Sequence, residues 1–335
     1  MPPASTPPTK DTIRIDSHLA DADGRSLARD AREGLTAPFK ELPPKHFYDA
    51  RGAQLFDRIT ELPEYYPTRA ERAILESSAT EIAAETNASE LVELGSGTAA
   101  KTRVLLDAMH EAGTLVRYVP VDVTEAMVRA CAEQLTSEYP GLQVYGVIGD
   151  FERHLDRVPE ASGPRLVVFL GGTIGNFEPR SRERVLAGIA ALLGPEDHLL
   201  LGTDLVKDPA VLEAAYDDEQ GVTAEFNRNV LRVLNRELGA DFDPDDFDHI
   251  AIFDPEHEWI EMRLRARREH TTLLRELDLP VHFDAGEELR TEISAKFTPE
   301  RVRADLAAAG LELVRWLTDP DDLFALTLSR RPSAD

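Results

Sequence analysis

The alternation of short apolar runs with helical stretches between residues 90 and 205 restricts the fold of this 335-residue chain more than any other feature. The apolar runs are LVELG (91–95), VRYVPVD (116–122), QVYGVIGD (143–150), RLVVFLGG (165–172) and HLLLGTDL (198–205). Helical patterns lie between them, near 99–110, from Thr124 onward and over 181–193. Runs that are apolar on both faces and joined by helices are typical of a parallel sheet with helical crossovers. The sequence therefore predicts an α/β protein.

The C-terminal segment predicts how this sheet ends. A helical stretch runs from Pro299 to Ala309, and two strand-like segments follow at 311–317 and 323–330. The turn between them, Thr318 to Asp322, is too short to be a crossover connection. We therefore expect the final strand to run antiparallel to its neighbour.

Two regions do not fit the pattern of the sheet. Residues 25–80 are helical, with a kinked centre at EYYPT, and residues 208–296 combine two helical stretches with alternating, strand-like segments. We divide the chain accordingly into a disordered tail (1–20), an N-terminal helical cap (21–80), a core (81–207), an inserted α+β subdomain (208–296) and a C-terminal helix with strands that complete the core sheet (297–331).

Charge and cysteine content exclude several classes of function. The chain has 62 acidic and 37 basic residues, a formal net charge of −25, which repels nucleic acids and anionic membranes. No apolar run approaches the ~20 residues that cross a bilayer, and the first residues lack the apolar stretch of a secretory signal. The single cysteine, Cys131, excludes an internal disulfide, and its helical context predicts a small core residue. We expect a cytoplasmic protein without nucleic-acid or membrane partners.

A glycine-rich turn follows the first predicted strand of the sheet. The segment Glu93–Thr98 (ELGSGT) lies where this strand gives way to a helix, and glycines there let the backbone approach a ligand at a helix N-terminus. A tight turn without a ligand would have the same pattern. Gly95, Gly97 and Ala100 also satisfy the looser dinucleotide fingerprint G-x-G-x-x-A.

Acidic residues at the ends of the next two strands indicate which ligand binds there. Asp122 is placed to accept the hydroxyls of a ribose, and Asp150 to accept the exocyclic amine of adenine while Phe151 packs on the ring. Each alone could be a helix cap or a turn residue. Together with the glycine turn they form a row along the carboxyl edge of the sheet, where open α/β folds bind ligands. Because the final antiparallel strand resembles the seven-stranded Rossmann-like sheet of methyltransferases, S-adenosylmethionine is favoured over NAD.

Several polar and aromatic stretches outside the sheet identify a family. They are FYD (47–49), PEYYPTR (63–69), GGTIGNF (171–177), AYDD (215–218), GVTAEFNRN (221–229) and TEISAKF (291–297). From about residue 40 to 330 the chain resembles the histidine-specific methyltransferases of ergothioneine biosynthesis. These enzymes use S-adenosylmethionine to trimethylate the α-amino group of L-histidine, giving hercynine and S-adenosylhomocysteine. The resemblance implies a seven-stranded methyltransferase sheet with a helical cap and an inserted substrate-binding subdomain. We expect a monomer, although the sequence does not give the oligomeric state.

The resemblance also implies a role for individual residues. The residues expected to contact S-adenosylmethionine are Tyr48, Gly95, Lys101, Asp122, Asp150 and Phe151. Asn176 and Tyr216 would hold the backbone groups of the amino acid, chiefly its carboxylate. Those expected to bind the imidazole are Tyr65, Glu292 and Ser294, with Met262 packing nearby. Tyr48 and Asn176 are our candidate catalytic residues, and no metal is expected, because the nine histidines show no metal-ligand spacing.

The chemistry of imidazole is compatible with these assignments. A neutral imidazole has one N–H donor and one acceptor, which a carboxylate and a hydroxyl complement. Glu292 and Ser294 are two residues apart on a strand-like segment, so their side chains point the same way. The alternatives are a solvent-exposed strand acid for Glu292, a loop cap for Asn176, and core packing for Tyr65 and Tyr66. We favour core packing for Tyr66.

Three other functions remain open at this point. An N-methyltransferase for another amino acid, such as a tryptophan derivative, would be expected to have an apolar lining in place of Glu292 and Ser294. A catalytically silent S-adenosylmethionine-binding protein would not need a complete set of substrate residues. An NAD-dependent dehydrogenase is disfavoured by the antiparallel last strand and by Asp150.

Overall fold

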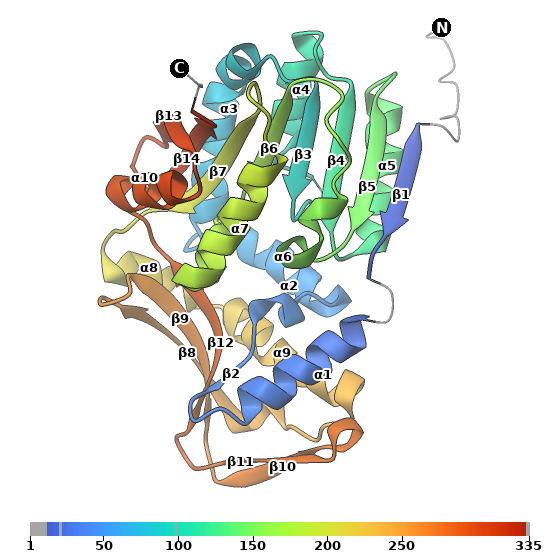
Figure 1. The fold of residues 1–335 in the computed structure, drawn as a ribbon. Helices are drawn as coiled ribbons and strands as arrows, with labels where there is room; N and C mark the ends of the chain where they lie inside the picture. Colours follow the sequence, from blue (N-terminus) through green and yellow to red (C-terminus); the bar gives the residue numbers. More distant parts are fainter. Residues whose placement is uncertain (1–11, 20–21, 98, 333–335) are drawn as a thin grey trace, which may run out of the picture.

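A central sheet of eight strands forms the upper half of the molecule in Figure 1. The computed structural model describes residues 12–19, 22–97 and 99–332. In spatial order the strands are β1 (Ile13–Ser17), β5 (Gln143–Ile148), β4 (Arg117–Asp122), β3 (Glu90–Leu94), β6 (Arg165–Phe169), β7 (His198–Asp204), β14 (Phe324–Arg330) and β13 (Glu312–Thr318). The strands from β1 to β7 pair in parallel. β14 runs antiparallel to both β7 and β13, which confirms the prediction for the final strand.

The eighth strand, β1, corrects two expectations. We predicted seven strands and a disordered tail over residues 1–20, but Ile13–Ser17 pairs in parallel with β5. Residues 1–11 and 20 lie outside the described residues. Without β1, the outer edge of β5 would present unpaired backbone groups, and Gly146 of β5 leaves room for the Ile15 side chain. A five-residue strand beside a segment rich in proline, serine and threonine has too little periodicity to be recognised from sequence.

Helices cover both faces of the central sheet. On one face lie α3 (Pro67–Thr86), α4 (Arg103–Glu111) and α5 (Glu125–Glu138), whose apolar side chains share a core with Leu91 and Leu166. On the other face lie α6 (Phe151–His154), η2 (Leu155–Arg157), α7 (Pro179–Leu192) and α10 (Pro299–Ala308), which cover Val92 and Val167. Neighbouring residues of one strand thus enter opposite cores, as expected for a sheet buried on both faces. Cys131 packs in the first core as predicted, and burial raises the pKa of its thiol to about 11.

A second, smaller sheet lies below the first in Figure 1. Its strands, in spatial order, are β2 (Lys40–Glu41), β12 (Glu288–Ala295), β9 (Trp259–Ala266) and β8 (Phe247–Asp254). The other elements of this part are α1 (Ala22–Leu35), η1 (Pro44–Phe47), α2 (Ala50–Thr60), α8 (Pro209–Tyr216), α9 (Val222–Leu238), η4 (Pro244–Asp246), and the hairpin of β10 (His270–Leu274) and β11 (Leu279–Phe283) with η5 (Arg275–Leu277) between its strands.

The N-terminal helices and the inserted segment share one hydrophobic core, which we call the lower core, and together they form the lower lobe of the molecule. Leu35 of α1 and Leu55 of α2 belong to the same buried cluster as Leu234 of α9 and Leu264 of β9. The parallel pairing of β2 with β12 joins the same two regions of the chain. We propose that this lobe is the substrate-binding part of the molecule and, apart from the tail, keep the domain boundaries given above as a proposal. No helix of the described residues is both long and apolar enough to be a candidate membrane span.

Candidate active site

The glycine turn after β3 leaves open space beside its backbone. Gly95 has φ +73° and Gly97 has φ +49°, both in the left-handed region that favours glycine. Among the described residues, a Cβ on Gly95 would contact only the ring of Phe151, at 4.0 Å, and a Cβ on Gly97 would have no neighbour within 4 Å. The turn therefore has room for a ligand against its backbone. Thr98 of the same motif lies outside the described residues.

The two strand-end acids are held by backbone N–H groups. Asp122 accepts hydrogen bonds from Gly97 N at 3.0 Å and from Thr124 N at 2.9 Å, one on each carboxylate oxygen. Asp150 caps α6 by accepting from Glu152 N at 2.9 Å, and Phe151 lies edge-on against Phe169. Asp150 thus has the helix-capping role, and Asp122 the turn role, that we considered for them. Each carboxylate also keeps lone pairs for a ligand, because a carboxylate has about four acceptor sites.

A buried acid, Glu71, holds Lys101 at the same edge of the sheet, and we did not predict this role from the sequence. The Lys101 ammonium group forms an ion pair with Glu71 of α3, which is fully buried. The other oxygen of Glu71 accepts a hydrogen bond from Gly171 N, just after β6, at 2.7 Å. A Cβ on Gly202 would lie only 2.4 Å from this oxygen, so the close approach of β7 requires a glycine there. Glu71 thereby connects Lys101 to the carboxyl end of β6.

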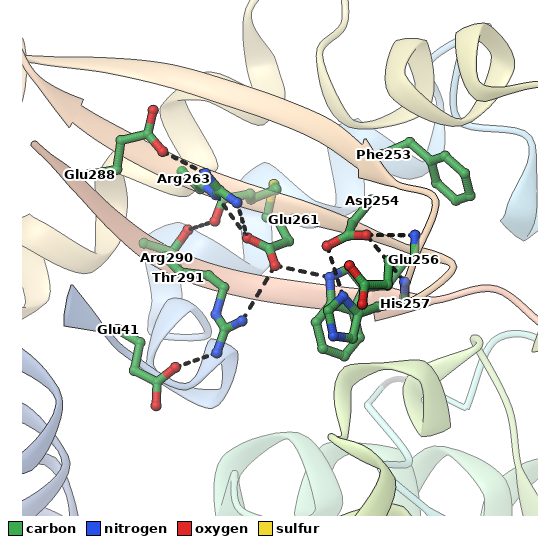
Figure 2. A network of polar contacts seen from close by, with 12 residues as sticks. Glu41, Phe253, Asp254, Glu256, His257, Glu261, Arg263, Glu288, Arg290 and Thr291 are labelled. Atoms are coloured by element: carbon green, nitrogen blue, oxygen red, sulfur yellow. Dashed lines mark hydrogen bonds and ion pairs between the residues drawn. The ribbon is translucent and has the colours of Figure 1, made fainter. Parts of the chain in front are cut away.

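A β-bulge in β12 decides which way Glu292 points. β12 pairs antiparallel with β9, and the register shifts between Arg290 and Glu292, so that Thr291 is an extra residue. Arg290 pairs with Arg263 in the polar network of Figure 2, whereas Glu292 pairs with Met262, which is buried in the lower core. Strict alternation would place positions 290 and 292 on the same face. Bulges next to active sites commonly re-aim a side chain in this way.

Hydrogen bonds on both sides of the strand hold the bulge. Thr291 Oγ1 lies 2.6 Å from Asn227 Oδ1 and 3.0 Å from the Met262 carbonyl oxygen. On the outer face Arg290 forms ion pairs with Glu41 of β2 and, at 3.4 Å, with Glu261 of β9 (Figure 2). These contacts anchor the strand just before Glu292.

Glu292 lies among tyrosines that come from three separate segments. The charge of Glu292 acts on Tyr48 after η1, on Tyr65 before α3 and on Tyr216 of α8, and together with burial it raises the pKa of Tyr65. The rings of Tyr65 and Tyr216 are 6.2 Å apart, edge to face. Tyr65 and Tyr216 are each 8% exposed, whereas Tyr48 is 43% exposed.

Asn176 connects this cluster to the central sheet, because it lies on the segment that follows β6. It ends the short helix η3 (Thr173–Asn176), which packs so closely on β12 that a Cβ on Gly175 would lie 2.7 Å from the Ala295 carbonyl oxygen. Burial raises the pKa of Glu292 to about 7, although the Lys296 ammonium and a hydrogen bond from Asn176 both act to lower it. Glu292 is therefore a partly buried acid on the inner face, and its interpretation as a solvent-exposed strand acid is wrong.

Four more charged or polar residues join the site, and our sequence reasoning missed their roles. Lys296 is fully buried and lies 2.8 Å from Asp204 Oδ2, at the end of β7. Tyr66 is buried in the lower core as expected, and its hydroxyl also donates to the Asp204 carboxylate at 2.9 Å. Lys207 lies 2.7 Å from Asp204 Oδ1. Lys296 is two residues beyond Ser294, and this alternation was the sequence feature that could have indicated it.

The sequence over residues 27–331 matches the family model described as histidine-specific methyltransferase, SAM-dependent. The chain belongs to this family. It is 54% identical to a histidine N-alpha-methyltransferase of Mycolicibacterium smegmatis, over 96% of this chain and 100% of that protein. It is 52% identical to a histidine N-alpha-methyltransferase of Mycobacterium tuberculosis, over 95% of this chain and 99% of that protein. It is also 33% identical to ergothioneine biosynthesis protein 1 of Schizosaccharomyces pombe, over 70% of this chain and 32% of that protein.

The structure of this histidine-specific methyltransferase places the predicted site residues in two groups. At the carboxyl ends of β3, β4 and β5 or in the turns that follow lie Gly95, Lys101, Asp122, Asp150 and Phe151. Around β12 lie Tyr48, Tyr65, Asn176, Tyr216, Met262, Glu292 and Ser294. The ring of Tyr48 packs against Phe56 and Phe226, and its contact with the cofactor stays a prediction. Among residues 12–19, 22–97 and 99–332, no three histidine, cysteine or acidic side chains are grouped so that they could hold a metal ion.

Proposed function

We propose that this protein transfers methyl groups from S-adenosylmethionine to the α-amino group of L-histidine, three times in succession, to form hercynine in ergothioneine biosynthesis. The observation that carries the proposal is the inner face of β12, where a partly buried carboxylate (Glu292) and a buried hydroxyl (Ser294) lie side by side. Membership of the histidine-specific family and the names of the mycobacterial relatives support it.

The upper group of residues is suited to hold S-adenosylmethionine. The open space beside Gly95 and Gly97 leaves room for the cofactor against the backbone of the turn. The Asp122 carboxylate, held by Gly97 N, is suited to accept the ribose hydroxyls. Asp150 would accept the adenine amine while the ring of Phe151 packs on the base, and Lys101 would complete the site. When bound, S-adenosylmethionine supplies a methyl group on a positively charged sulfur. The residues of the protein hold the reactants in line and exclude water.

The lower group of residues would hold the amino acid. Glu292 would accept the imidazole N–H, and Ser294 would donate to the other ring nitrogen, with Tyr65 and Met262 against the ring. Asn176 and Tyr216 would hold the carboxylate. A tryptophan derivative has no second ring nitrogen to accept from Ser294, so the polar lining favours histidine. A silent binding protein would not need this second set of residues.

The α-amine must lose a proton before each transfer, because it is an ammonium in neutral water. Tyr48 and Asn176 remain our candidate catalytic residues, and we propose that the proton leaves to solvent by way of Tyr48 or a bound water. The rate should therefore climb with pH as the free amine becomes available. We further propose that the enzyme acts as a cytoplasmic monomer without a metal ion and that it binds neither nucleic acid nor membrane.

Incubation of the protein with S-adenosylmethionine and all twenty amino acids, followed by mass spectrometry, tests the proposal. We expect histidine alone to be consumed and to gain three methyl groups. Preferred methylation of another amino acid would show that this amino acid, and not histidine, is the substrate. Binding of S-adenosylmethionine without any transfer would support the silent protein instead.

A further inference from the structure

Lys296 has no task in the reaction as described, yet every proton of its ammonium group has a partner. The side chain is fully buried. Its Nζ lies 2.8 Å from Asp204 Oδ2, 2.9 Å from Ser294 Oγ and 3.0 Å from the Tyr216 hydroxyl. An ammonium has three N–H donors and no acceptor, so these three contacts use all of them. Two of the three partners are residues that we assign to the substrate.

The ammonium group restricts what the two hydroxyls can do. Tyr216 OH and Ser294 Oγ are 2.8 Å apart, so one donates to the other while both accept from Lys296. The hydroxyl that accepts from the other can therefore point its own hydrogen at another acceptor. When an amino acid is bound, both hydroxyls can turn their hydrogens toward it and release each other. Each oxygen then still accepts from Lys296, so neither is left without a partner in a buried site.

Asp204 keeps Lys296 charged and in place. Burial alone would lower the pKa of Lys296, but the Asp204 carboxylate and the Tyr216 hydroxyl raise it above the usual range. Burial would likewise raise the pKa of Asp204, and the charges of Lys296 and Lys207 lower it instead. Asp204 also accepts from Tyr66, so its position does not depend on Lys296 alone.

We propose that Lys296, held by Asp204, is a positioning residue that commits the hydroxyls of Tyr216 and Ser294 to donate to the bound amino acid. Tyr216 donates to the carboxylate and Ser294 to the unprotonated ring nitrogen. This inference rests on the proposed function. It implies that the site selects neutral histidine with its single N–H toward Glu292, because a ring protonated at both nitrogens would set donor against donor at Ser294.

A double-mutant cycle separates this role from a structural one. The Lys296→Met substitution is made in the native enzyme and in a Tyr216→Phe/Ser294→Ala background. In the native enzyme we expect kcat/KM for histidine to fall about 30-fold, the usual effect of losing hydrogen bonds from a charged group. In the background without the hydroxyls, the same substitution should cost less than about threefold. Affinity for S-adenosylhomocysteine, measured by calorimetry, should stay unchanged and report an intact fold.

Each other outcome overturns a specific claim. Equal losses in both backgrounds would make the effect of Lys296 independent of the hydroxyls and overturn the proposal. If Lys296→Met does not bind S-adenosylhomocysteine, the cycle is repeated with Lys296→Met/Asp204→Asn, which removes both partners of the ion pair. Loss of this binding there too would make Lys296 a structural residue. Full histidine activity of Tyr216→Phe/Ser294→Ala itself would instead overturn the substrate assignment under the proposed function.

Discussion

At the scale of single residues, the acids of the site differ in what holds them. Asp122 is fixed by two backbone N–H groups, those of Gly97 and Thr124. Glu292 has no backbone donor among its described contacts and depends on Asn176 and on the charge of Lys296. Burial therefore dominates at Glu292 and raises its pKa to about 7. A ligand that donates a hydrogen bond to Glu292 would relieve this cost.

Replacing Asp122 should weaken the cofactor site specifically. We expect Asp122→Ala to reduce the affinity for S-adenosylmethionine by about 1.5–3 kcal/mol, typical of a hydrogen bond to a charged group, while the fold persists. Isothermal calorimetry measures this affinity. Asp243→Ala is a matched control, because Asp243 also caps a turn by accepting a backbone N–H but lies in the lower lobe. Unchanged affinity in Asp122→Ala would contradict the assignment.

Replacing Glu292 should damage the recognition of histidine. We expect Glu292→Ala to lower kcat/KM for histidine about a hundredfold, since a buried N–H left unpaired is costly, and to change cofactor affinity little. Amino acids whose side chains cannot donate a hydrogen bond should lose less. Steady-state kinetics with histidine and phenylalanine measure both effects.

The control for this substitution lies on the same strand. Glu288 points to the opposite face of β12, where it forms an ion pair with Arg263 at 2.6 Å (Figure 2). Glu288→Ala should leave histidine kinetics nearly unchanged. An equal loss for histidine and phenylalanine in Glu292→Ala would show that Glu292 supports structure only.

At the scale of elements, the contact between η3 and β12 joins the central sheet to the small sheet. Asn176 ends η3, which follows β6 of the central sheet, whereas Glu292 lies in the small sheet, and the close packing at Gly175 joins η3 to β12. Ala295 and Ile293 also belong to the core that α7 and α10 form with the central sheet, so the end of β12 is packed between this sheet and the lower lobe. An element packed on both sides moves little, which suits a site that must align two reactants.

The Gly175→Ala substitution tests this contact. The added Cβ would lie 2.7 Å from the Ala295 carbonyl oxygen, so η3 must move away from β12. We expect a loss of stability of about 1–3 kcal/mol, typical of overpacking, and a fall of about tenfold in kcat/KM for histidine. Thermal unfolding and steady-state kinetics measure these changes. Affinity for S-adenosylhomocysteine should be retained, and unaltered kinetics would show that η3 does not position Asn176.

At the scale of the whole molecule, one buried and one partly buried carboxyl group make stability depend on pH. Burial raises the pKa of Glu93 and of Glu292 to about 7, well above the usual range of a glutamate. The folded state therefore binds these protons more tightly than the unfolded chain does. The contribution to stability is fully present below about pH 4.5 and is lost as the pH rises through about 7.

The Glu292→Gln variant isolates the contribution of one of these groups. The variant keeps the shape of the side chain but cannot ionise, so it should be more stable than the native protein at pH 8 and about equally stable at pH 4. Thermal unfolding of both proteins across this range measures the difference in stability. Because all other charged groups are the same in the two proteins, their effect on stability largely cancels in this difference. A difference that does not change with pH would contradict the raised pKa.

The sequence by itself determined the features that depend on local order along the chain. The parallel sheet, its antiparallel last strand and the glycine turn with Asp122 and Asp150 all follow from periodicity and from the direction of consecutive strands. The equal orientation of Glu292 and Ser294 also followed, because side chains alternate along a strand. The roles of the substrate residues came from the family resemblance rather than from these patterns.

Only the tertiary structure decided which of these residues meet. Alternation does not say which face of β12 is the inner one, and the bulge at Thr291 sets it through contacts with α9 and β9. The partner of Lys296 is Asp204, on a strand far away in sequence, and nothing local to either residue identifies the pair. The pairing of β1 with β5 has the same origin. Each depends on free energy gained between distant segments, when buried polar groups find partners and sheet edges are covered.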